Sequence, residues 1–130
     1  MRAHFILFVN DQVRSTAFYS NVLDMAPSLN VPGMTEFELN GGAVLGLMPE
    51  AGIRRLLGPA LPDMTPCRGI PRAEIYLVSD DAWRLHKRAL AAGARELSTV
   101  AARDWGHLAG YSLDPDGHVI AFAQDIEDET

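Results

Sequence analysis

Hydrophobic and polar positions follow two different periods along the chain, and their order predicts the elements of the first half. A continuous apolar run at 5–9 is typical of a buried strand. Asn10 or Asp11 follows, and either side chain can cap a helix. Apolar residues then recur four positions apart within 18–23, which predicts one buried helical face. The helix is expected to end before Pro27.

Three further strands are expected between this helix and position 49. Residues 29–31 form a short apolar segment between two prolines, as an edge strand would. Apolar and polar residues alternate over 35–39, which predicts a strand with one wetter face. The Asn-Gly-Gly sequence at 40–42 is a hairpin turn, and 43–48 is the returning strand. The first half therefore reads strand, helix, strand, strand, strand.

Residues 50–71 interrupt this regularity with prolines at 59, 62, 66 and 71. A short helix is expected near 53–57. We interpret the segment as a connecting arm, because neither flanking part is long enough to bury an independent core.

The same order of elements then returns. Residues 4–7 align with 74–77, and residues 42–47 align with 117–122. Such self-similarity indicates two copies of one structural unit. The expected elements of the second copy are a strand at 73–78, a helix capped by Asp80 or Asp81 and ended by Gly93, and strands at 95–100, 108–113 and 118–122, the last two joined by the turn at 114–117.

This repeat resembles the vicinal oxygen chelate superfamily, which includes glyoxalase I, bleomycin-resistance proteins and extradiol dioxygenases. The residues that carry the resemblance are His4, Asp11, Ser15, Phe18, Tyr19, Val22, Leu23, Trp105, Gly106, Tyr111, Asp114, Pro115, Asp116 and Gly117. The family usually has glycine where this chain has Asp24. The resemblance implies an α+β fold in which two tandem βαβββ modules form curled mixed sheets around a cavity. It also implies a homodimer.

On this basis residues 1–125 are expected to form a single domain. Module one spans 1–49, the arm spans 50–71 and module two spans 72–125. Acidic residues gather at the C-terminal end, namely Asp125, Glu127, Asp128 and Glu129. Residues 126–130 are therefore expected to be a disordered acidic tail.

Composition excludes several classes of protein. The net charge of −6 argues against a nucleic-acid binder, which needs a basic face. No apolar run is long enough to cross a bilayer, so no membrane partner is expected. A single cysteine, Cys67, allows neither an internal disulfide nor a cysteine-based zinc cluster, and without an activating partner it is expected to be inert. We expect a cytoplasmic protein.

Metal-dependent relatives place ligands at four positions on the first and last strands of their modules. The resemblance carries these positions onto His4, Gly46, Glu74 and Ala121. Gly46 and Ala121 have no donor atom, so no cofactor or tightly bound metal is expected. A weakly held divalent metal on His4 and Glu74 is the alternative. Glu36 or Glu38 could add a carboxylate.

Five aromatic residues are the expected contributors to a ligand pocket: Phe8, Phe37, Tyr76, Trp105 and Tyr111. Core packing would explain any one of them equally well. Trp105 has the better claim because it lies in a loop, before a glycine and a strand. Among the histidines, His86 is expected at the surface of the second helix, His107 either in a solvated loop or at the cavity mouth, and His118 on the helix side.

Three functions remain open at this point. The first is a binding protein of the bleomycin-resistance type, which sequesters a small, partly aromatic molecule without metal. The second is a lyase or dioxygenase of the glyoxalase type, with His4 and Glu74 in an incomplete or rearranged ligand set or as an acid–base pair. The third is an assembly role with a vestigial cavity. The sequence leaves open whether there is turnover.

Overall fold

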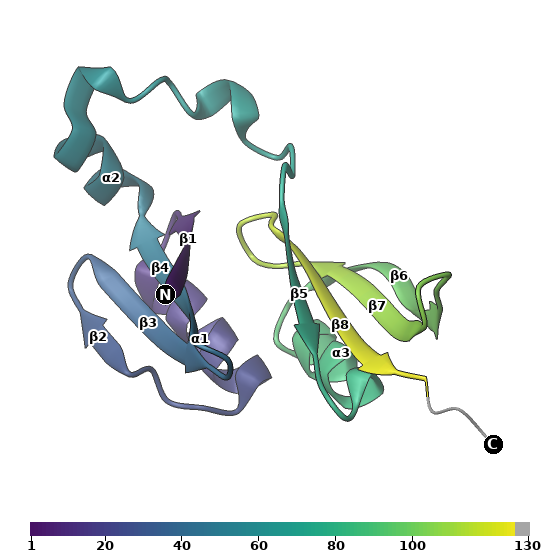
Figure 1. Cartoon of the computed structure of the whole chain (residues 1–130). Coiled ribbons are helices and arrows are strands. Elements are labelled where there is room, and N and C mark those ends of the chain that lie inside the picture. Colours follow the sequence, from purple (N-terminus) through teal and green to yellow (C-terminus); the bar gives the residue numbers. More distant parts are fainter. Residues whose placement is uncertain (127–130) are drawn as a thin grey trace. The chain divides into compact units, whose positions relative to one another are not determined.

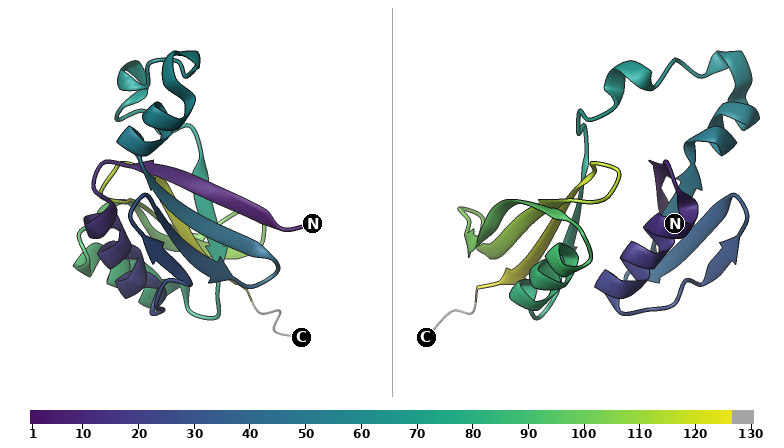
Figure 2. Two further views of the ribbon diagram at one scale, coloured as in Figure 1. Left: turned by 90° about the vertical axis from the view of Figure 1, so that its left-hand side faces the viewer. Right: turned by 180° about the vertical axis from the view of Figure 1, so that it is seen from behind.

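The computed structural model describes residues 1–126 and divides the chain into two compact units, Met1–Pro66 and Cys67–Thr130. The boundary lies inside the expected arm. Each unit contains one four-stranded sheet and one long helix, and Figures 1 and 2 show each helix against its own sheet. The α+β class and the tandem βαβββ modules are therefore confirmed. No helix among residues 1–126 is long and apolar enough to cross a membrane.

The first unit follows the expected order of elements. They are β1 (Ala3–Val9), α1 (Gln12–Leu23), β2 (Leu29–Val31), β3 (Met34–Leu39), β4 (Ala43–Pro49) and α2 (Glu50–Leu57), followed along the chain by 3-10 turns at Gly58–Ala60 and Thr65–Cys67. The sheet order is β1-β4-β3-β2, with β1 parallel to β4 and the other pairs antiparallel. A parallel pair needs a crossover between its strands, and α1 lies in that crossover.

The second unit repeats this arrangement. Its elements are β5 (Glu74–Val78), α3 (Ala82–Ala91), β6 (Arg95–Ala102), β7 (His107–Leu113) and β8 (Val119–Asp125). The sheet order is β5-β8-β7-β6, with β5 parallel to β8. The last strand is longer than the apolar pattern predicts. Asp125, the first of the acidic residues near the C-terminal end, is the last residue of β8, while residues 127–130 of the expected tail lie outside the described part of the chain.

Both long helices begin as the sequence predicts. The Asp11 carboxylate accepts a hydrogen bond from the Arg14 backbone N–H, and Asp81 does the same for Arg84, both at 3.1 Å. These bonds satisfy one of the free N–H groups of each first turn. At its other end α1 stops at Asp24, which adopts a left-handed conformation with φ of 53°. That conformation explains why glycine suits this position.

The expected buried face of α1 is also confirmed. Phe18, Tyr19 and Val22 are buried, and the rings of Phe18 and Tyr19 meet edge to face with centroids 5.0 Å apart. On β3 the alternation works as predicted, since Phe37 is buried and Glu38 is exposed. The first core therefore forms between α1 and one face of its sheet.

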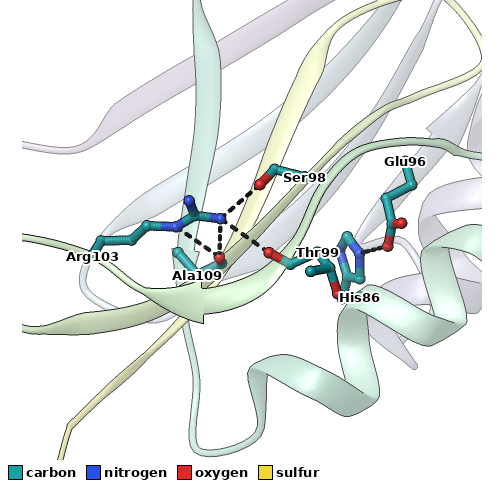
Figure 3. A network of polar contacts seen from close by, with 6 residues as sticks. All are labelled: His86, Glu96, Ser98, Thr99, Arg103 and Ala109. Atoms are coloured by element: carbon teal, nitrogen blue, oxygen red, sulfur yellow. Dashed lines mark hydrogen bonds and ion pairs between the residues drawn. The ribbon is translucent and has the colours of Figure 1, made fainter.

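On α3 the structure differs from the sequence prediction at His86, which was expected at the surface and is only 1% exposed. Its Nε2 lies 2.7 Å from the Glu96 carboxylate on β6, so the ring is buried with an acidic partner (Figure 3). Gly110 on β7 makes room for it. A Cβ at position 110 would lie 2.8 Å from His86 Nδ1 and 2.7 Å from the Val100 side chain.

Candidate functional site

The functional groups of the second unit gather on the face of its sheet that turns away from α3. Gly110 points toward α3, so its neighbours Ala109 and Tyr111 point to the other face. The strand register then places Tyr76, Ala121 and Tyr111 side by side in one row across β5, β8 and β7. We call this side of the sheet the tyrosine face.

Four residues form a chain of polar contacts at one end of the tyrosine face, two of them hydrogen bonds and the third an ion-pair contact. The indole N–H of Trp105 donates to the Tyr76 hydroxyl oxygen at 2.9 Å. The same hydroxyl lies 2.5 Å from Nδ1 of His107, and Nε2 of His107 lies 3.1 Å from Asp125 Oδ1. The Tyr76 and His107 rings are inclined by only 26°. Side chains from β5, β7, β8 and one loop thus meet in an unbroken polar path.

The loop that presents Trp105 is held by backbone bonds on both sides. The Arg103 N–H donates to the His107 carbonyl at 2.8 Å, and the Ile126 N–H donates to the Gly106 carbonyl at 3.1 Å. Gly106 has φ of +88°, a conformation that a residue with a side chain adopts at a cost. Trp105 is 57% exposed on this fixed loop. Its indole is therefore both accessible and oriented before any ligand arrives.

Arg103 supplies a fixed cation beside the tyrosine face. Its guanidinium donates to the Ala109 carbonyl, the Thr99 carbonyl and the Ser98 hydroxyl at 2.8–3.1 Å (Figure 3). The pairing of β6 with β7 is irregular between Ser98 and Ala101, so the guanidinium satisfies backbone groups near this irregularity. These bonds use Nε and Nη2, and Nη1 has no partner among the described residues.

The same guanidinium lies over the Tyr111 ring, 5.1 Å from its centroid, which is a cation–π distance. Burial raises the pKa of the Tyr111 hydroxyl above its usual value, and the charges of Glu74 and Tyr76 act in the same direction. Arg103 opposes this effect on the pKa only in part. Tyr111 is therefore a neutral hydrogen-bonding group at any physiological pH.

The expected pocket residues divide between the two units. Tyr76, Trp105 and Tyr111 come together on the tyrosine face. Phe8 is half-buried in β1, opposite Met48 of β4. Phe37 is wholly buried and lies on the α1 side of its sheet, because its neighbour Thr35 two positions away bonds to α1. The structure thus makes Phe37 a core residue.

His4 has an acidic partner within its own unit. Its Nδ1 lies 3.3 Å from the Glu36 carboxylate of β3, and both side chains are partly exposed. Gly46 is opposite Glu36 in the β3–β4 register, and a Cβ there would lie 3.0 Å from the Ile6 side chain. His4 and Glu36 could therefore offer one imidazole and one carboxylate to a metal, while position 46 offers nothing.

The second unit also lacks half of the expected ligands. Glu74 lies at the exposed start of β5, whereas Ala121 is buried and has no donor. The four positions implied by the resemblance thus hold two donors, which do not fit the four-ligand site of metal-dependent relatives.

Another group of side chains could hold a cation. Ligand atoms of Asp114, Asp116 and His118 lie within 4.8 Å of one another in the turn between β7 and β8. The Asp114 carboxylate, however, already accepts from the N–H groups of Asp116 and His118, at 2.8 and 2.9 Å, and lies 2.9 Å from His118 Nδ1. Stabilisation of the turn explains this cluster without a metal. His118 therefore takes part in the turn through its contacts with Asp114.

Sequence reasoning missed Arg103 and gave Asp125 no role in a site. For His107 it left two places open, a solvated loop and the cavity mouth, and the structure places its ring against Tyr76. A signal existed for His107, since it lies two positions after Trp105 at the start of the predicted strand. Nothing in the sequence pairs Arg103 with Tyr111.

Comparison with known proteins adds an independent finding. Residues 2–122 match the family model described as Glyoxalase/Bleomycin resistance protein/Dioxygenase superfamily. Among solved structures, the chain is similar to a glyoxalase-related enzyme from Fulvimarina pelagi, with 26% identity and a TM-score of 0.80 over 96% of this chain and 88% of that one. No curated protein matches the chain.

Two further structures share the fold at lower identity. One is a glyoxalase/bleomycin resistance protein/dioxygenase family enzyme from Burkholderia phytofirmans PsJN, with 18% identity and a TM-score of 0.78 over 95% of this chain and 97% of that one. The other is a glyoxalase/bleomycin resistance protein/dioxygenase from Nocardioides, with 23% identity and a TM-score of 0.74 over 100% of this chain and 86% of that one.

Proposed function

Because the chain belongs to the glyoxalase/bleomycin resistance protein/dioxygenase superfamily, we propose that it binds a small, partly aromatic molecule on the tyrosine face without a tightly bound metal. One observation carries the proposal. The indole of Trp105 is exposed, yet its N–H is fixed to Tyr76 on the face that also presents Tyr111. A fixed aromatic surface binds a ring without first losing side-chain freedom.

The charge beside this surface favours an anionic group on the ligand. Arg103 is held in place by four hydrogen bonds to two backbone carbonyls and one hydroxyl, and Nη1 remains available. A charged N–H donor forms stronger hydrogen bonds to carboxylates and phosphates than a neutral one, and Nη1 can supply such donors. We therefore expect an aromatic carboxylate or a similar aromatic anion to bind better than its uncharged analogue.

The donor chemistry supports binding without a metal. His4 and Glu74 are the two donors at the four expected positions, since Gly46 and Ala121 have no donor atom. Metal affinity falls as the number of protein ligands falls. A metal-dependent lyase or dioxygenase that uses His4 and Glu74 is the second candidate, and the Glu36 carboxylate beside the His4 imidazole favours it.

A second copy of the chain is the proposed protein partner, in the cytoplasm. β1 and β5 lie at the edges of their sheets and carry exposed apolar residues, including Phe5, Ile6 and Val78. Exposed apolar edges of this kind are usually covered in an assembly. Sedimentation equilibrium at micromolar concentration tests this proposal, and a monomer at all concentrations contradicts it.

The experiment on the ligand combines a screen with a chelator. A thermal-shift screen against antibiotics, glutathione conjugates and aromatic carboxylates should give a stabilising compound. Its affinity is then measured by calorimetry before and after treatment with a chelator. The proposal predicts equal affinities, whereas binding that disappears with the metal, and returns when the metal is restored, supports the lyase or dioxygenase candidate.

A further inference from the structure

The geometry points to Tyr76 as a proton-transferring group, a general base whose proton passes to His107 and whose action depends on Asp125. The inference deepens the proposed function, because it assigns chemistry to one residue of the face on which the ligand is proposed to bind. It begins from the three consecutive contacts between Trp105, Tyr76, His107 and Asp125, none of which exceeds 3.1 Å.

The direction of each hydrogen bond follows from the chemistry of the groups. An indole N–H can only donate, so Trp105 donates to the Tyr76 oxygen. The Asp125 carboxylate lies 3.1 Å from Nε2 of His107, and its negative charge favours the neutral tautomer that carries its proton on Nε2. Nδ1 of His107 is then an acceptor, and the Tyr76 hydroxyl donates to it. The chain of donors therefore runs from the phenol to the carboxylate.

This order prepares the Tyr76 proton for transfer. The proton moves from the Tyr76 oxygen to Nδ1 of His107, which produces a phenolate and an imidazolium. The imidazolium keeps its Nε2–H on Asp125, and the phenolate keeps the N–H of Trp105. The charges thus formed each face a group of complementary polarity. His107 and Asp125 act through Tyr76 and are positioning residues.

The phenolate can then accept a proton from a bound acid. An O–H or acidic C–H bond of the ligand breaks, its proton joins the Tyr76 oxygen, and the ligand becomes an anion. Arg103 lies beside the same face, over Tyr111, and favours that anion. The imidazolium then loses its Nε2 proton to water at the Asp125 end, where the carboxylate is 82% exposed, and keeps the proton from Tyr76 on Nδ1. The resting tautomer is restored when these steps run in reverse and the Tyr76 oxygen gives a proton to the product or to water. No oxidant, reductant or metal enters this balance.

The charged groups around Tyr76 come from four elements. Glu74 lies two positions away on β5, His107 on β7 and Asp125 on β8, while Arg103 lies at the start of the Trp105 loop. The substrate class that fits this surrounding is an aromatic compound with a weakly acidic proton, such as a phenol or a carbon acid next to a carbonyl group.

The test measures the reactivity of the Tyr76 oxygen and needs no ligand. Methanesulfonyl fluoride has no ring and reacts with tyrosine oxygens. The phenol oxygen bonds to sulfur, fluoride leaves, and the phenolic proton passes to the neighbouring base. The chain has three tyrosines, of which Tyr19 is buried and Tyr111 has a raised pKa. Peptide mass spectrometry should therefore show Tyr76 modified much faster than Tyr111 near neutral pH.

Two variants separate a proton relay from a structural role. His107→Gln should lower the rate of Tyr76 modification at least about tenfold, because it removes the base. Asp125→Asn should lower it by a smaller factor with little change in shape. Asp104→Asn removes another carboxylate near the loop and should leave the rate unchanged. Circular dichroism and thermal unfolding identify any variant that fails to fold. If His107→Gln fails to fold, the rate of Tyr76 modification in Asp125→Asn tests the inference instead.

Nitrogen-15 spectra give a second readout. Neutral His107, assigned by its loss in His107→Gln, should carry its proton on Nε2. The inference is overturned if Tyr76 reacts no faster than Tyr111, if the folded variants keep the wild-type rate, or if the Nδ1–H tautomer is found. Failure of aromatic ligands to bind would contradict the proposed function alone, since the probe has no ring.

Discussion

The imidazole of His86 occupies the space in which a side chain at Gly110 would have to lie. A Cβ at position 110 would approach Nδ1 of His86 to 2.8 Å and the Val100 side chain to 2.7 Å. Both distances are shorter than real contacts of a Cβ. The ring is buried and bonded to Glu96 at 2.7 Å, so it has little freedom to move away. The packing of α3 against its sheet thus depends on the absence of a side chain at position 110.

Gly110→Ala should therefore destabilise the protein by about 1–3 kcal/mol, the usual cost of overpacking a core. Urea unfolding followed by circular dichroism measures this change. Gly52→Ala is the matched control, because a Cβ at position 52 would make only ordinary contacts. Gly52 also lies in a helix, where alanine is favoured over glycine. His86→Ala combined with Gly110→Ala should recover part of the loss. An unchanged unfolding midpoint in Gly110→Ala would contradict this view of the packing.

Much of the fold could be predicted because its signals are local. Asp11 and Asp81 cap helices through bonds to residues three positions later, and such caps are visible in a sequence. Alternation over 35–39 and the repeated order of elements placed most strands within about two residues. The end of β8 was harder to predict, since this strand continues through polar Gln124 and Asp125 beyond the apolar pattern.

The candidate site could be predicted only in part, because its contacts join residues far apart in the chain. Trp105 was identified from its loop and the following glycine. Its bond to Tyr76 spans 29 positions, and the bond of Tyr76 to His107 spans 31. His86 shares the buried face of α3 with Ala82 and Ala89, but its side chain is polar, and its burial depends on the bond to Glu96 and on the space left by Gly110. Pairing of this kind leaves no periodic signal.

The raised pKa of Tyr111 gives a prediction in alkaline solution. Burial and the charge of Glu74 keep the hydroxyl protonated in the folded chain above about pH 10, the usual pKa of tyrosine. The unfolded chain loses this proton first, so stability falls as pH rises from about 10 through the pKa of folded Tyr111. Below about pH 10 the group contributes no pH dependence.

Ultraviolet titration of tyrosine absorbance measures this pKa directly. The absorbance change that is lost in Tyr111→Phe should occur above pH 10, and Glu74→Gln should move it to lower pH because one cause of the shift is removed. If Tyr111 in the wild type instead gives its absorbance change at or below pH 10, the placement of Tyr111 on a partly buried face beside Glu74 would be wrong.

The donor set at the expected metal positions predicts the metal content of the purified protein. Two donors at four positions should retain less than about a third of an equivalent of zinc, nickel, iron or manganese. Elemental analysis before and after dialysis against a chelator measures the content. One full equivalent per chain that is lost in His4→Ala would support the metal-dependent candidate instead. Asp114→Asn is the control for a cation held in the turn between β7 and β8.

The central claim, that the tyrosine face binds an aromatic ligand, is tested most directly at Trp105. Trp105→Ala removes the exposed indole and should weaken binding of the compound found by thermal shift about tenfold or more, which corresponds to roughly 1.4 kcal/mol. Stacking beyond simple burial contributes about 0.5–1.5 kcal/mol of this loss. Trp83→Ala is the matched control, because Trp83 is also exposed but lies on α3.

Calorimetric titration of the compound into the wild type, Trp105→Ala and Trp83→Ala is therefore the decisive measurement. Tryptophan emission of the Trp83→Phe variant reports Trp105 alone and should shift when the compound binds. The account predicts a wild-type affinity for Trp83→Ala and an affinity at least about tenfold lower for a folded Trp105→Ala. Equal affinities of all three proteins, with unchanged Trp105 emission at saturation, would contradict it.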